Sequence, residues 1–333
     1  MRVLVTGGGG FLGKALVRKL LSQGHSVRSF SRGDYPELRE LGVETISGDL
    51  SDYKAVHEAV RDCELVYHVG AKAGVWGRYD DYYATNVMGT QNIIEACLAQ
   101  DVEYLVNTSS PSVIFDGHDQ EGNDESTPYP KKYLAYYPQT KALAEQAVTQ
   151  ANSDQLKTVS LRPHLIWGPE DTQLIPRLVE QGRAGKLRLI GSGTKRIDAV
   201  YIDNAVDAHI NAATQLMHGG KCAGKTYFIT NDDPWPFEQI VNGILEAAGV
   251  APVTRHVSPS LAYTAGGLLE CVYRITGKTD EPRMTRFVAR QLATAHWYDI
   301  AAAKDDLGYS PAVSMEEGLA QLKQWFEQKE EVS

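Results

Sequence analysis

Hydrophobic and polar positions along the first half of the chain follow two alternating periods. Short β-branched runs predict strands, and between them apolar residues recur every three or four positions, as in amphipathic helices. The predicted strands span residues 2–7, 26–30, 43–48, 64–69, 104–109 and 157–162, and the predicted helices span residues 11–21, 54–60, 85–98 and 138–150. Strands that alternate with helices require crossover connections, which build a parallel sheet covered on both faces. We therefore predict an α/β fold with a doubly wound parallel sheet.

The pattern becomes less regular in the second half of the chain. Residues 195–230 hold a long helical run and a strand, which look like additions to the first domain. Residues 165–194 and 231–333 look like a smaller, mostly helical lobe. We therefore expect a first domain over residues 1–164 and 195–230 that is interleaved in sequence with this second lobe.

Composition and charge narrow the class of protein. Of 333 residues, 43% are hydrophobic and 23% are charged, which is typical of a globular protein. The formal net charge of -9 argues against a nucleic-acid partner, because such binding depends on clustered Lys and Arg. A strand predicted from residue 2 leaves no room for a signal peptide, and no apolar run of about 18 residues predicts a membrane span. The spacing of the four cysteines matches no metal-binding or redox motif. We therefore expect free thiols without a catalytic role, no metal site and a cytoplasmic location.

The first predicted strand ends in a glycine-rich turn, TGGGGFLG. Gly7, Gly10 and Gly13 are spaced as G-x-x-G-x-x-G between this strand and the first helix. Glycine is needed where the backbone passes close to a diphosphate and where helix and strand pack together, and the helix N-terminus offers free N–H groups to the anion. This position in the chain predicts dinucleotide binding in a Rossmann-type domain.

The end of the second predicted strand indicates which dinucleotide is bound. Rossmann-type domains that bind NAD usually place an acid here, which accepts hydrogen bonds from the adenosine ribose. This chain has Ser31 and Arg32 instead, and no carboxylate until Asp34. A serine and an arginine suit the 2'-phosphate of NADP(H), and Arg28 takes that role only if the strand ends earlier than predicted. After the third strand, Asp49 is placed to accept a hydrogen bond from the adenine amino group.

The stretch AYYPQTKALAE places Tyr137 four residues before Lys141. Pro138 fits the first position of a helix, because its missing N–H is not needed there. The tyrosine and the lysine then lie one turn apart on the same face. A fixed ammonium favours the phenolate, which lowers the phenol pKa from about 10 toward working pH and makes the group a usable proton donor. This spacing also arises by chance, so an ordinary surface helix is the alternative.

Serine hydroxyls decide between these alternatives. The fifth predicted strand leads into NTSSPSV, which brings Ser109, Ser110 and Ser112 to the carboxyl edge of the sheet. Ligands bind at that edge in doubly wound folds. A serine hydroxyl there holds a substrate carbonyl oxygen while the tyrosine protonates it.

With these motifs the chain resembles the extended short-chain dehydrogenases/reductases of the 3β-hydroxysteroid dehydrogenase type. The motifs lie along the whole chain in the order of that family: TGGGGFLG, GDL, NVMGTQNIIEAC, NTSSPSV, YPQTK, LRPHLIWGP, YIDNAVDAH and LGYSP. By position, Ser110 matches the catalytic serine, with Ser112 as the alternative. Tyr137 and Lys141 match the catalytic tyrosine and lysine, and Asn86 matches a structural asparagine. The resemblance also implies cofactor contacts from Phe11, Leu12, Leu50, Ala71, Tyr137, Lys141 and Pro163.

A narrower likeness concerns the substrate. It is carried by RGDYPELRELGV, AKAGVWGRYDDYYATNVMGTQN, SSPSVIFDG, LIWGPED and TAHWYDIAAAKDDLGYSP. These segments resemble the 2-alkyl-3-oxoalkanoate reductases of bacterial long-chain olefin biosynthesis and, less closely, the sterol-4α-carboxylate 3-dehydrogenases. The first resemblance implies NADPH-dependent reduction of a 2-alkyl-3-oxo acid to the 3-hydroxy acid. Pro111 and Ser112 stand where sugar-nucleotide dehydratases of this superfamily carry acids, which argues against dehydration.

Two other functions remain as alternatives. An NAD(P)-dependent hydroxysteroid or sterol-carboxylate dehydrogenase would use the same Ser-Tyr-Lys set. A redox-sensing regulator would bind the dinucleotide without catalysis, and the intact set argues against it, because a sensor does not need it. The resemblance also implies a homodimer, formed through a bundle of helices over residues 86–98 and 138–150, and suggests association with other enzymes of an olefin pathway.

The proposed substrate and two helical segments lead to further expectations. A buried substrate carboxylate needs a cation, and Lys72, Arg78 and Arg162 are the candidates. Ser314 and Glu317 form a capping-box pattern that predicts the start of the last helix.

The segment SLAYTAGGLLECVYRITG, residues 260–277, is apolar at first and then amphipathic. It either lines a pocket for long alkyl chains, rests on a membrane surface or forms an ordinary buried helix. Glu270 and Arg274 interrupt the apolar run, which argues against a helix that crosses the bilayer.

Overall fold

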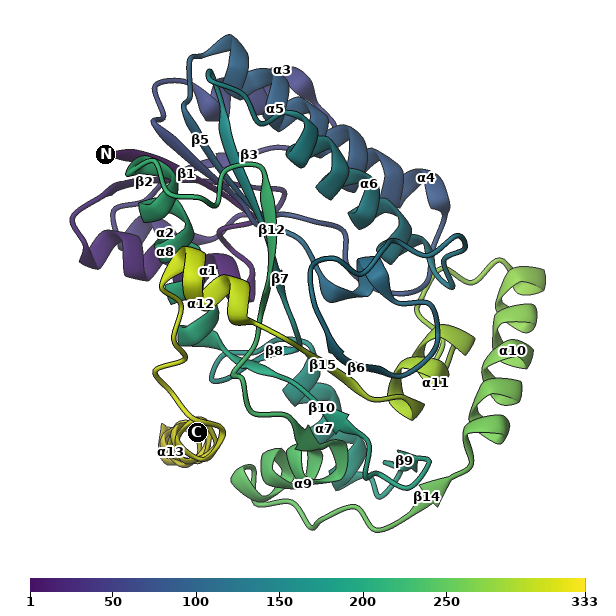
Figure 1. Ribbon diagram of the computed structural model, residues 1–333. Helices are drawn as coiled ribbons and strands as arrows, with labels where there is room; N and C mark the ends of the chain where they lie inside the picture. Colours follow the sequence, from purple (N-terminus) through teal and green to yellow (C-terminus); the bar gives the residue numbers. More distant parts are fainter. Residues whose placement is uncertain (333) are drawn as a thin grey trace.

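A seven-stranded parallel sheet forms the centre of the chain in the computed structural model, which describes residues 1–332 (Figure 1). Its strands are β1 (Arg2–Thr6), β2 (Ser26–Ser31), β3 (Glu44–Ser47), β4 (Leu65–His68), β5 (Tyr104–Thr108), β7 (Lys157–Pro163) and β12 (Lys225–Ile229). They lie in the order β12-β7-β5-β4-β1-β2-β3, and every neighbouring pair is parallel. The carboxyl ends of all seven strands therefore meet at one edge.

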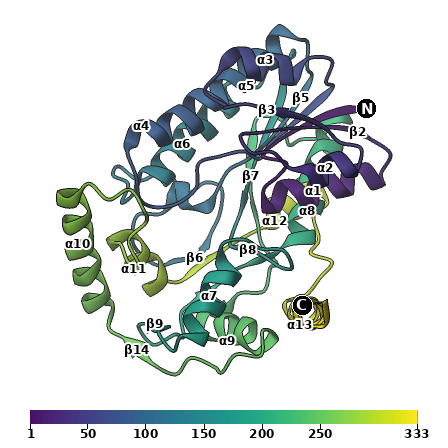
Figure 2. The ribbon, with the colours of Figure 1, turned by 180° about the vertical axis from the view of Figure 1, so that it is seen from behind.

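Helices cover both faces of this sheet (Figures 1 and 2). One face carries α3 (Tyr53–Val60), α5 (Gly89–Ala99) and α6 (Tyr136–Gln150), and the other carries α1 (Phe11–Ser22), α8 (Ile202–Met217) and α12 (Ala301–Leu307). Side chains alternate along each strand, so Val3 and Val5 join the core on one face while Leu4 joins the core on the other. The predicted doubly wound α/β fold is confirmed.

Two helices differ locally from the prediction. Residues 85–98 were expected to form one regular helix. The chain instead forms α4 (Tyr79–Tyr82), then the π-helix η1 (Tyr83–Met88) and only then α5. Helix α6 begins at Tyr136, so Pro138 is its third residue and not its first. The proline is still tolerated, because the first four N–H groups of a helix have no intrahelical acceptor.

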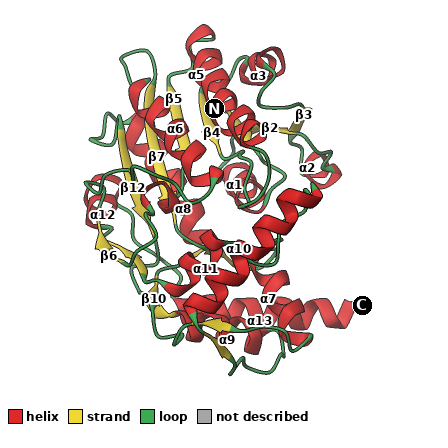
Figure 3. Cartoon of the chain, turned by 90° about the vertical axis from the view of Figure 1, so that its right-hand side faces the viewer, coloured by secondary structure: helices red, strands yellow, loops and turns green. Residues whose placement is uncertain are grey.

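The remaining helices lie mostly beyond the carboxyl edge of the sheet (Figure 3). They are α7 (Leu174–Arg183), α9 (Phe237–Ala247), α10 (Pro259–Thr276), α11 (Arg286–Ala293) and α13 (Met315–Val332), with the short α2 (Pro36–Glu40) after β2 and the 3-10 turn η2 (Pro111–Ile114) after β5. The capping box is confirmed, because Ser314 N–H donates to Glu317 Oε2 at 2.9 Å and Glu317 N–H donates to Ser314 Oγ at 3.1 Å. The residue bounds of the two interleaved domains stay a prediction.

Short strands connect these helices. A four-stranded sheet has the order β13-β10-β15-β6, and two further pairs are β11-β8 and β14-β9. The strands are β6 (Gln120–Asn123), β8 (Ile166–Trp167), β9 (Leu189–Ile190), β10 (Arg196–Ile197), β11 (Val200–Tyr201), β13 (Trp235–Pro236), β14 (His256–Val257) and β15 (His296–Tyr298). Strand β15 brings the C-terminal part of the chain next to the segment that follows the catalytic serine candidate.

Helix α10 lies at the outer edge of the molecule and packs mainly against α11 (Figures 1 and 3). Its side chains Leu268, Val272 and Ile275 are 65%, 51% and 80% exposed. The expectation of an ordinary buried helix is therefore wrong for this segment. Among residues 1–332, no helix has both the length and the hydropathy needed to cross a bilayer.

Candidate active site

The turn between β1 and α1 brings two backbone segments unusually close together. Gly7 has a φ of +70°, and a Cβ on it would lie 2.8 Å from the Cα of Gly70, so a side chain has no room there. The N-cap of α1 is Gly10, which offers no side-chain cap to the first N–H groups. This turn therefore presents free donors to an anion at the carboxyl edge of the sheet.

A cavity of about 600 Å³ extends from this turn across the carboxyl ends of the strands. Twelve of the residues predicted for the site line it: Gly7, Gly10, Phe11, Leu12, Gly13, Ser31, Arg32, Leu50, Ala71, Ser110, Tyr137 and Pro163. Two predicted residues, Asp49 and Lys141, are not in its wall. The carboxylate of Asp49 accepts hydrogen bonds from the backbone N–H and the hydroxyl of Ser51, which hold its pKa below the usual value.

The end of β2 has the polar character that the sequence indicated. Arg32 is exposed at the cavity wall, and the Ser31 hydroxyl accepts from the N–H of Gly9 at 3.5 Å. The carboxylate of Asp34 is paired with Arg39. Arg28 is buried, where its guanidinium donates to the carbonyl oxygens of Ala59 and Arg61 at 2.8 and 2.7 Å. Arg28 is therefore not available to a cofactor phosphate, and the alternative that assigned it this role is wrong.

Three predicted catalytic residues come from β5 and α6. Ser110 follows β5 directly and caps the turn η2. Its hydroxyl is hydrogen-bonded to that of Ser112 at 2.9 Å, and the phenol of Tyr137 lies close enough to Ser110 for hydrogen bonding to lower its pKa. Ser112 is buried, whereas Ser110 and Tyr137 both line the large cavity. This geometry favours Ser110 over Ser112 as the hydroxyl that acts together with Tyr137.

The electrostatics of the pair on α6 differ from the expectation. The side chain of Lys141 is buried, and its Nζ donates to the backbone oxygen of Thr108 at 2.6 Å. Burial lowers the pKa of Lys141 to about 8, although the carboxylate of Glu145 acts in the opposite direction. Burial raises the pKa of Tyr137, and the hydrogen bond with Ser110 lowers it only in part. The expected lowering of the Tyr137 pKa is therefore wrong, because burial outweighs the other influences on the phenol.

A buried ion pair lies one turn further along α6. The guanidinium of Arg162, on β7, donates to both carboxylate oxygens of Glu145 at 2.9 and 2.6 Å, and Tyr129 donates to the same carboxylate at 2.6 Å. The side chains of Arg162 and Glu145 are 3% and 0% exposed. Arg162 is therefore neutralised within the protein, and its candidacy as the ligand of a substrate carboxylate is wrong.

The π-helix places Asn86 between two parts of the site. Its side chain accepts from the N–H of Lys72 at 2.7 Å and donates to the carbonyl oxygen of Lys72 at 3.1 Å. The same amide donates to the hydroxyl of Thr140 on α6 at 3.0 Å. Asn86 thereby connects the loop after β4 to the helix that carries Tyr137 and Lys141. Its role as a structural asparagine stays a prediction.

Two further cavities are lined by a predicted catalytic residue or by its neighbour in the chain, Ser110 in one and Tyr136 in the other. One of about 590 Å³ lies between the loop after β4 and helices α10 and α11, and its aromatic lining consists of Trp76, Tyr79, Tyr133, Tyr136 and Phe287. The other, of about 110 Å³, is lined by Ser110 and Ser112 together with His164, His296 and Tyr298. Burial lowers the pKa of His164 to about 3 and that of His296 to about 4, so both rings are neutral near pH 7.

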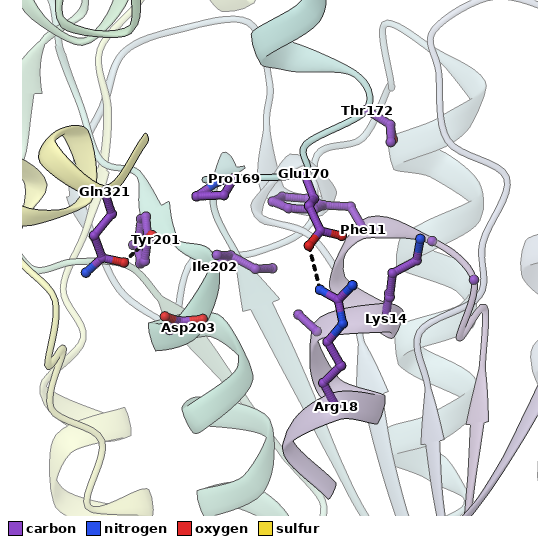
Figure 4. A pocket seen from close by; sticks show the side chains of 13 residues that line it. Phe11, Lys14, Arg18, Pro169, Glu170, Thr172, Tyr201, Ile202, Asp203 and Gln321 are labelled. Carbon is purple, nitrogen blue, oxygen red and sulfur yellow. Dashed lines mark hydrogen bonds and ion pairs between the residues drawn. The ribbon is translucent and has the colours of Figure 1, made fainter. Parts of the chain in front are cut away.

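Sequence reasoning missed one segment of the site. Residues 171–174, assigned to the second lobe, line the dinucleotide cavity beside the glycine turn. The same loop also borders a cavity of about 240 Å³ on the outer side of α1, where Arg18 donates to Glu170 at 2.6 Å (Figure 4). Tyr201 donates to Gln321 of α13 across that cavity at 2.7 Å. Only tertiary packing places this loop, so no local signal in the sequence could have identified it.

Comparison with known proteins supports the same reading of the site. The model of the 3-beta hydroxysteroid dehydrogenase/isomerase family matches residues 4–259. A 2-alkyl-3-oxoalkanoate reductase from Shewanella oneidensis is 50% identical over 327 residues, which cover 96% of this chain and 84% of that protein. A decarboxylating sterol-4-alpha-carboxylate 3-dehydrogenase from Mus musculus is 34% identical over 330 residues, which cover 97% of this chain and 90% of that protein.

A solved structure shows the same fold at lower identity. The UDP-glucuronic acid 4-epimerase from Bacillus cereus, crystallised in complex with NAD, matches 99% of both chains with a TM-score of 0.75 at 22% identity. The family match spans the glycine turn, the serine-bearing strand end and the Tyr137–Lys141 helix. The chain therefore belongs to the 3-beta hydroxysteroid dehydrogenase/isomerase family and is an NAD(P)-dependent oxidoreductase.

Proposed function

We propose that this enzyme uses NADPH to reduce a 2-alkyl-3-oxoalkanoate to the 2-alkyl-3-hydroxyalkanoate in long-chain olefin biosynthesis. The observation that carries the proposal is the position of Ser110 beside Tyr137 in the wall of the cavity that begins at the glycine turn. The relative from Shewanella oneidensis, 50% identical over nearly the whole chain, supports this choice of substrate.

The residues fit a dinucleotide and divide the chemistry between them. Gly7 lets the turn pack closely against Gly70, and the uncapped first N–H groups of α1 would bind the diphosphate. When bound, the nicotinamide supplies the hydride. Ser110 holds the substrate carbonyl oxygen and stabilises the negative charge that develops on it, and Tyr137 donates the proton to that oxygen. Lys141, which is buried one turn after Tyr137, is assigned to the ribose from the family resemblance alone.

The preference for NADPH follows from the end of β2. A 2'-phosphate carries about -1.5 to -2 charges near neutral pH, and an arginine meets it with several donors. Arg32 is exposed at the cavity wall, and the first carboxylate after it in the chain, Asp34, is paired with Arg39. NAD offers only a ribose hydroxyl at this position.

The carboxylate and the alkyl chains of the substrate need separate binding sites. With Arg162 paired to Glu145 in the interior, the candidate cations are Lys72 and Arg78, of which Arg78 lines the cavity with aromatic residues and forms an exposed ion pair with Asp80. We assign that cavity to the long alkyl chains because five aromatic rings line it, beside the charged residues Arg78, Asp80, Glu270, Arg274 and Arg286. Replacing Lys72 or Arg78 by Gln should raise the Michaelis constant for the acid, and an unchanged constant in both variants would exclude them.

The direct test is incubation with NADPH and a racemic long-chain 2-alkyl-3-oxo acid, followed at the nicotinamide absorbance. Consumption of NADPH with formation of the 3-hydroxy acid supports the proposal. Turnover only of a hydroxysteroid or a sterol carboxylate would favour the sterol dehydrogenase function, for which the relative from Mus musculus is the motive. Cofactor binding without turnover of any of these compounds would favour a regulator.

We also propose a homodimer that forms through α5 and α6. The outer sides of η1 and these two helices expose Met88, Leu98 and Leu143, at 44%, 40% and 37%. Two such pairs of helices packed together would bury these side chains. Light scattering of the unmodified protein should give twice the chain mass, and Leu143→Arg should give the monomer mass. A monomeric unmodified protein would end this proposal. Association with other enzymes of the pathway is proposed from the resemblance alone.

A further inference from the structure

The outer face of α10 is the most exposed apolar surface on a helix in the described part of the chain. Leu261, Leu268, Val272 and Ile275 are 60%, 65%, 51% and 80% exposed. They recur at intervals of three, four or seven residues, so they lie along one side of the helix. Isolated exposed leucines are ordinary in soluble proteins, but a continuous stripe of this kind marks an interaction surface.

The opposite face of α10 is already used for packing, so the helix cannot turn its apolar side inward. Glu270 is buried and accepts from Arg286, both at the backbone N–H, at 2.7 Å, and at the guanidinium, at 2.8 Å. A Cβ on Gly266 would lie 2.7 Å from the backbone of Thr285, which shows how closely the two segments approach. The orientation of α10 is therefore set by α11 and the residues just before it.

The charge around this face differs in sign from that of the whole protein. Residues 259–291 contain five cationic and three acidic residues, a net charge of +2, whereas the chain as a whole carries -9. One of the three acids, Glu270, is buried against Arg286, and another, Glu281, is paired with Arg177. Lys278, just after the stripe, is exposed and lies over the ring of Tyr273, whereas Arg274 lies over Trp76 on the cavity side. This surface matches an anionic partner better than a second copy of itself.

The position of α10 next to the cavity indicates what this surface could do. Glu270 and Arg274 line the cavity with aromatic walls that we assign to the alkyl chains, while Leu268, Val272 and Ile275 face solvent. Trp76, on the loop that borders the cavity, donates to the backbone oxygen of Lys278 just after the helix at 3.2 Å. One helix thus separates the cavity from the outside.

We propose that the outer face of α10 rests on the surface of an anionic lipid bilayer, with its apolar side chains among the acyl chains and its cations at the headgroups. This geometry would place the cavity next to the phase in which a long-chain substrate dissolves. The purpose rests on the proposed function, but the binding does not, since it depends only on the described surface.

Flotation with vesicles tests the proposal without any turnover. The unmodified protein should float with vesicles of phosphatidylcholine and phosphatidylglycerol, and less with vesicles of phosphatidylcholine alone. The double variant Leu268→Ser with Ile275→Ser should lower the bound fraction at least tenfold, because both side chains lose their transfer into the apolar phase. The control is Leu41→Ser with Tyr53→Ser, which removes two exposed apolar side chains elsewhere, 47% and 38% exposed, and should leave binding unchanged.

Three results would overturn the inference. Unmodified protein that stays wholly at the bottom of the gradient excludes a lipid surface. Equal loss of binding in the control variant means that general stickiness, and not α10, causes flotation. Light scattering without lipid that shows an assembly broken by Leu268→Ser with Ile275→Ser assigns this face to a second copy. The α10 variant should keep full activity on a short-chain soluble substrate, so a failure of the proposed reaction appears separately.

Discussion

Replacing Tyr137 with Phe removes one hydroxyl from the site and leaves its walls in place. In the structure that hydroxyl lies beside Ser110, and the ring lines the dinucleotide cavity. Ser110 keeps its other partner, the hydroxyl of Ser112 at 2.9 Å, so no buried group is left unpaired. The loss of one hydrogen bond should therefore cost only about 1 kcal/mol of the free energy of unfolding. Affinity for NADPH should stay nearly unchanged, because the hydride donor does not depend on this proton.

Turnover should fall much further than stability. General acid catalysis is worth about 10²–10⁴-fold, which corresponds to about 2.7–5.4 kcal/mol of activation free energy. The assay is kcat by nicotinamide absorbance, with the Kd of NADPH measured in parallel by fluorescence. Tyr136→Phe is the matched control, because that neighbouring side chain is 43% exposed and should give normal kcat. Near-normal kcat in Tyr137→Phe would refute the assignment and point to Tyr136 or Tyr133.

Three further predictions concern the cofactor, the core and pH. NADPH should be preferred over NADH at least tenfold in kcat/KM, about 1.4 kcal/mol, and Ser31→Asp with Arg32→Asn should reverse the preference; equal use of both cofactors by the unmodified protein contradicts this. Glu145→Leu leaves the buried Arg162 without its anion and should lower the free energy of unfolding in denaturant by about 3–5 kcal/mol; a loss below about 1 kcal/mol shows that the pair contributes little. The lowered pKa of Lys141 is about 8, so its ammonium should lose its proton as the pH rises through that value. The kcat/KM for NADPH should then fall. Lys141→Arg stays charged, so its residual activity should lack that fall, and a flat profile in the unmodified protein contradicts the role of the ammonium.

The parts of the fold that follow from local pattern were predictable. The two periods of apolar residues place all six strands predicted in the first half of the chain, because strands buried on both faces must be apolar throughout. The glycine turn and Ser110 could be placed at the carboxyl edge for a similar reason, because each follows a strand whose position in the sheet follows from the chain order.

Features that depend on tertiary contacts were not predictable. The sequence shows Arg162 as a free cation near the site, but only the crossing of α6 and β7 brings Glu145 to it. The lysine four residues after Tyr137 predicts a lowered phenol pKa. In the structure, the Nζ of Lys141 donates a hydrogen bond to the backbone oxygen of Thr108. The outward side of α10 was equally hidden, since an apolar stripe has the same period whether it faces a core or solvent.

The sheet has a consequence for how the protein is synthesised and divided. Strand β12 is at the edge of the sheet, where it pairs with β7, and helix α8 covers one face of the sheet. In the sequence, however, β8, α7 and three more short strands lie between β7 and these two elements. A nascent chain that ends before residue 229 therefore leaves β7 as an open edge. The predicted cofactor-binding domain is therefore not one contiguous segment, so it cannot be truncated at residue 164 and fused to another protein. Such a fragment should be recovered as aggregate, whereas a tag added beyond the last helix leaves the sheet complete.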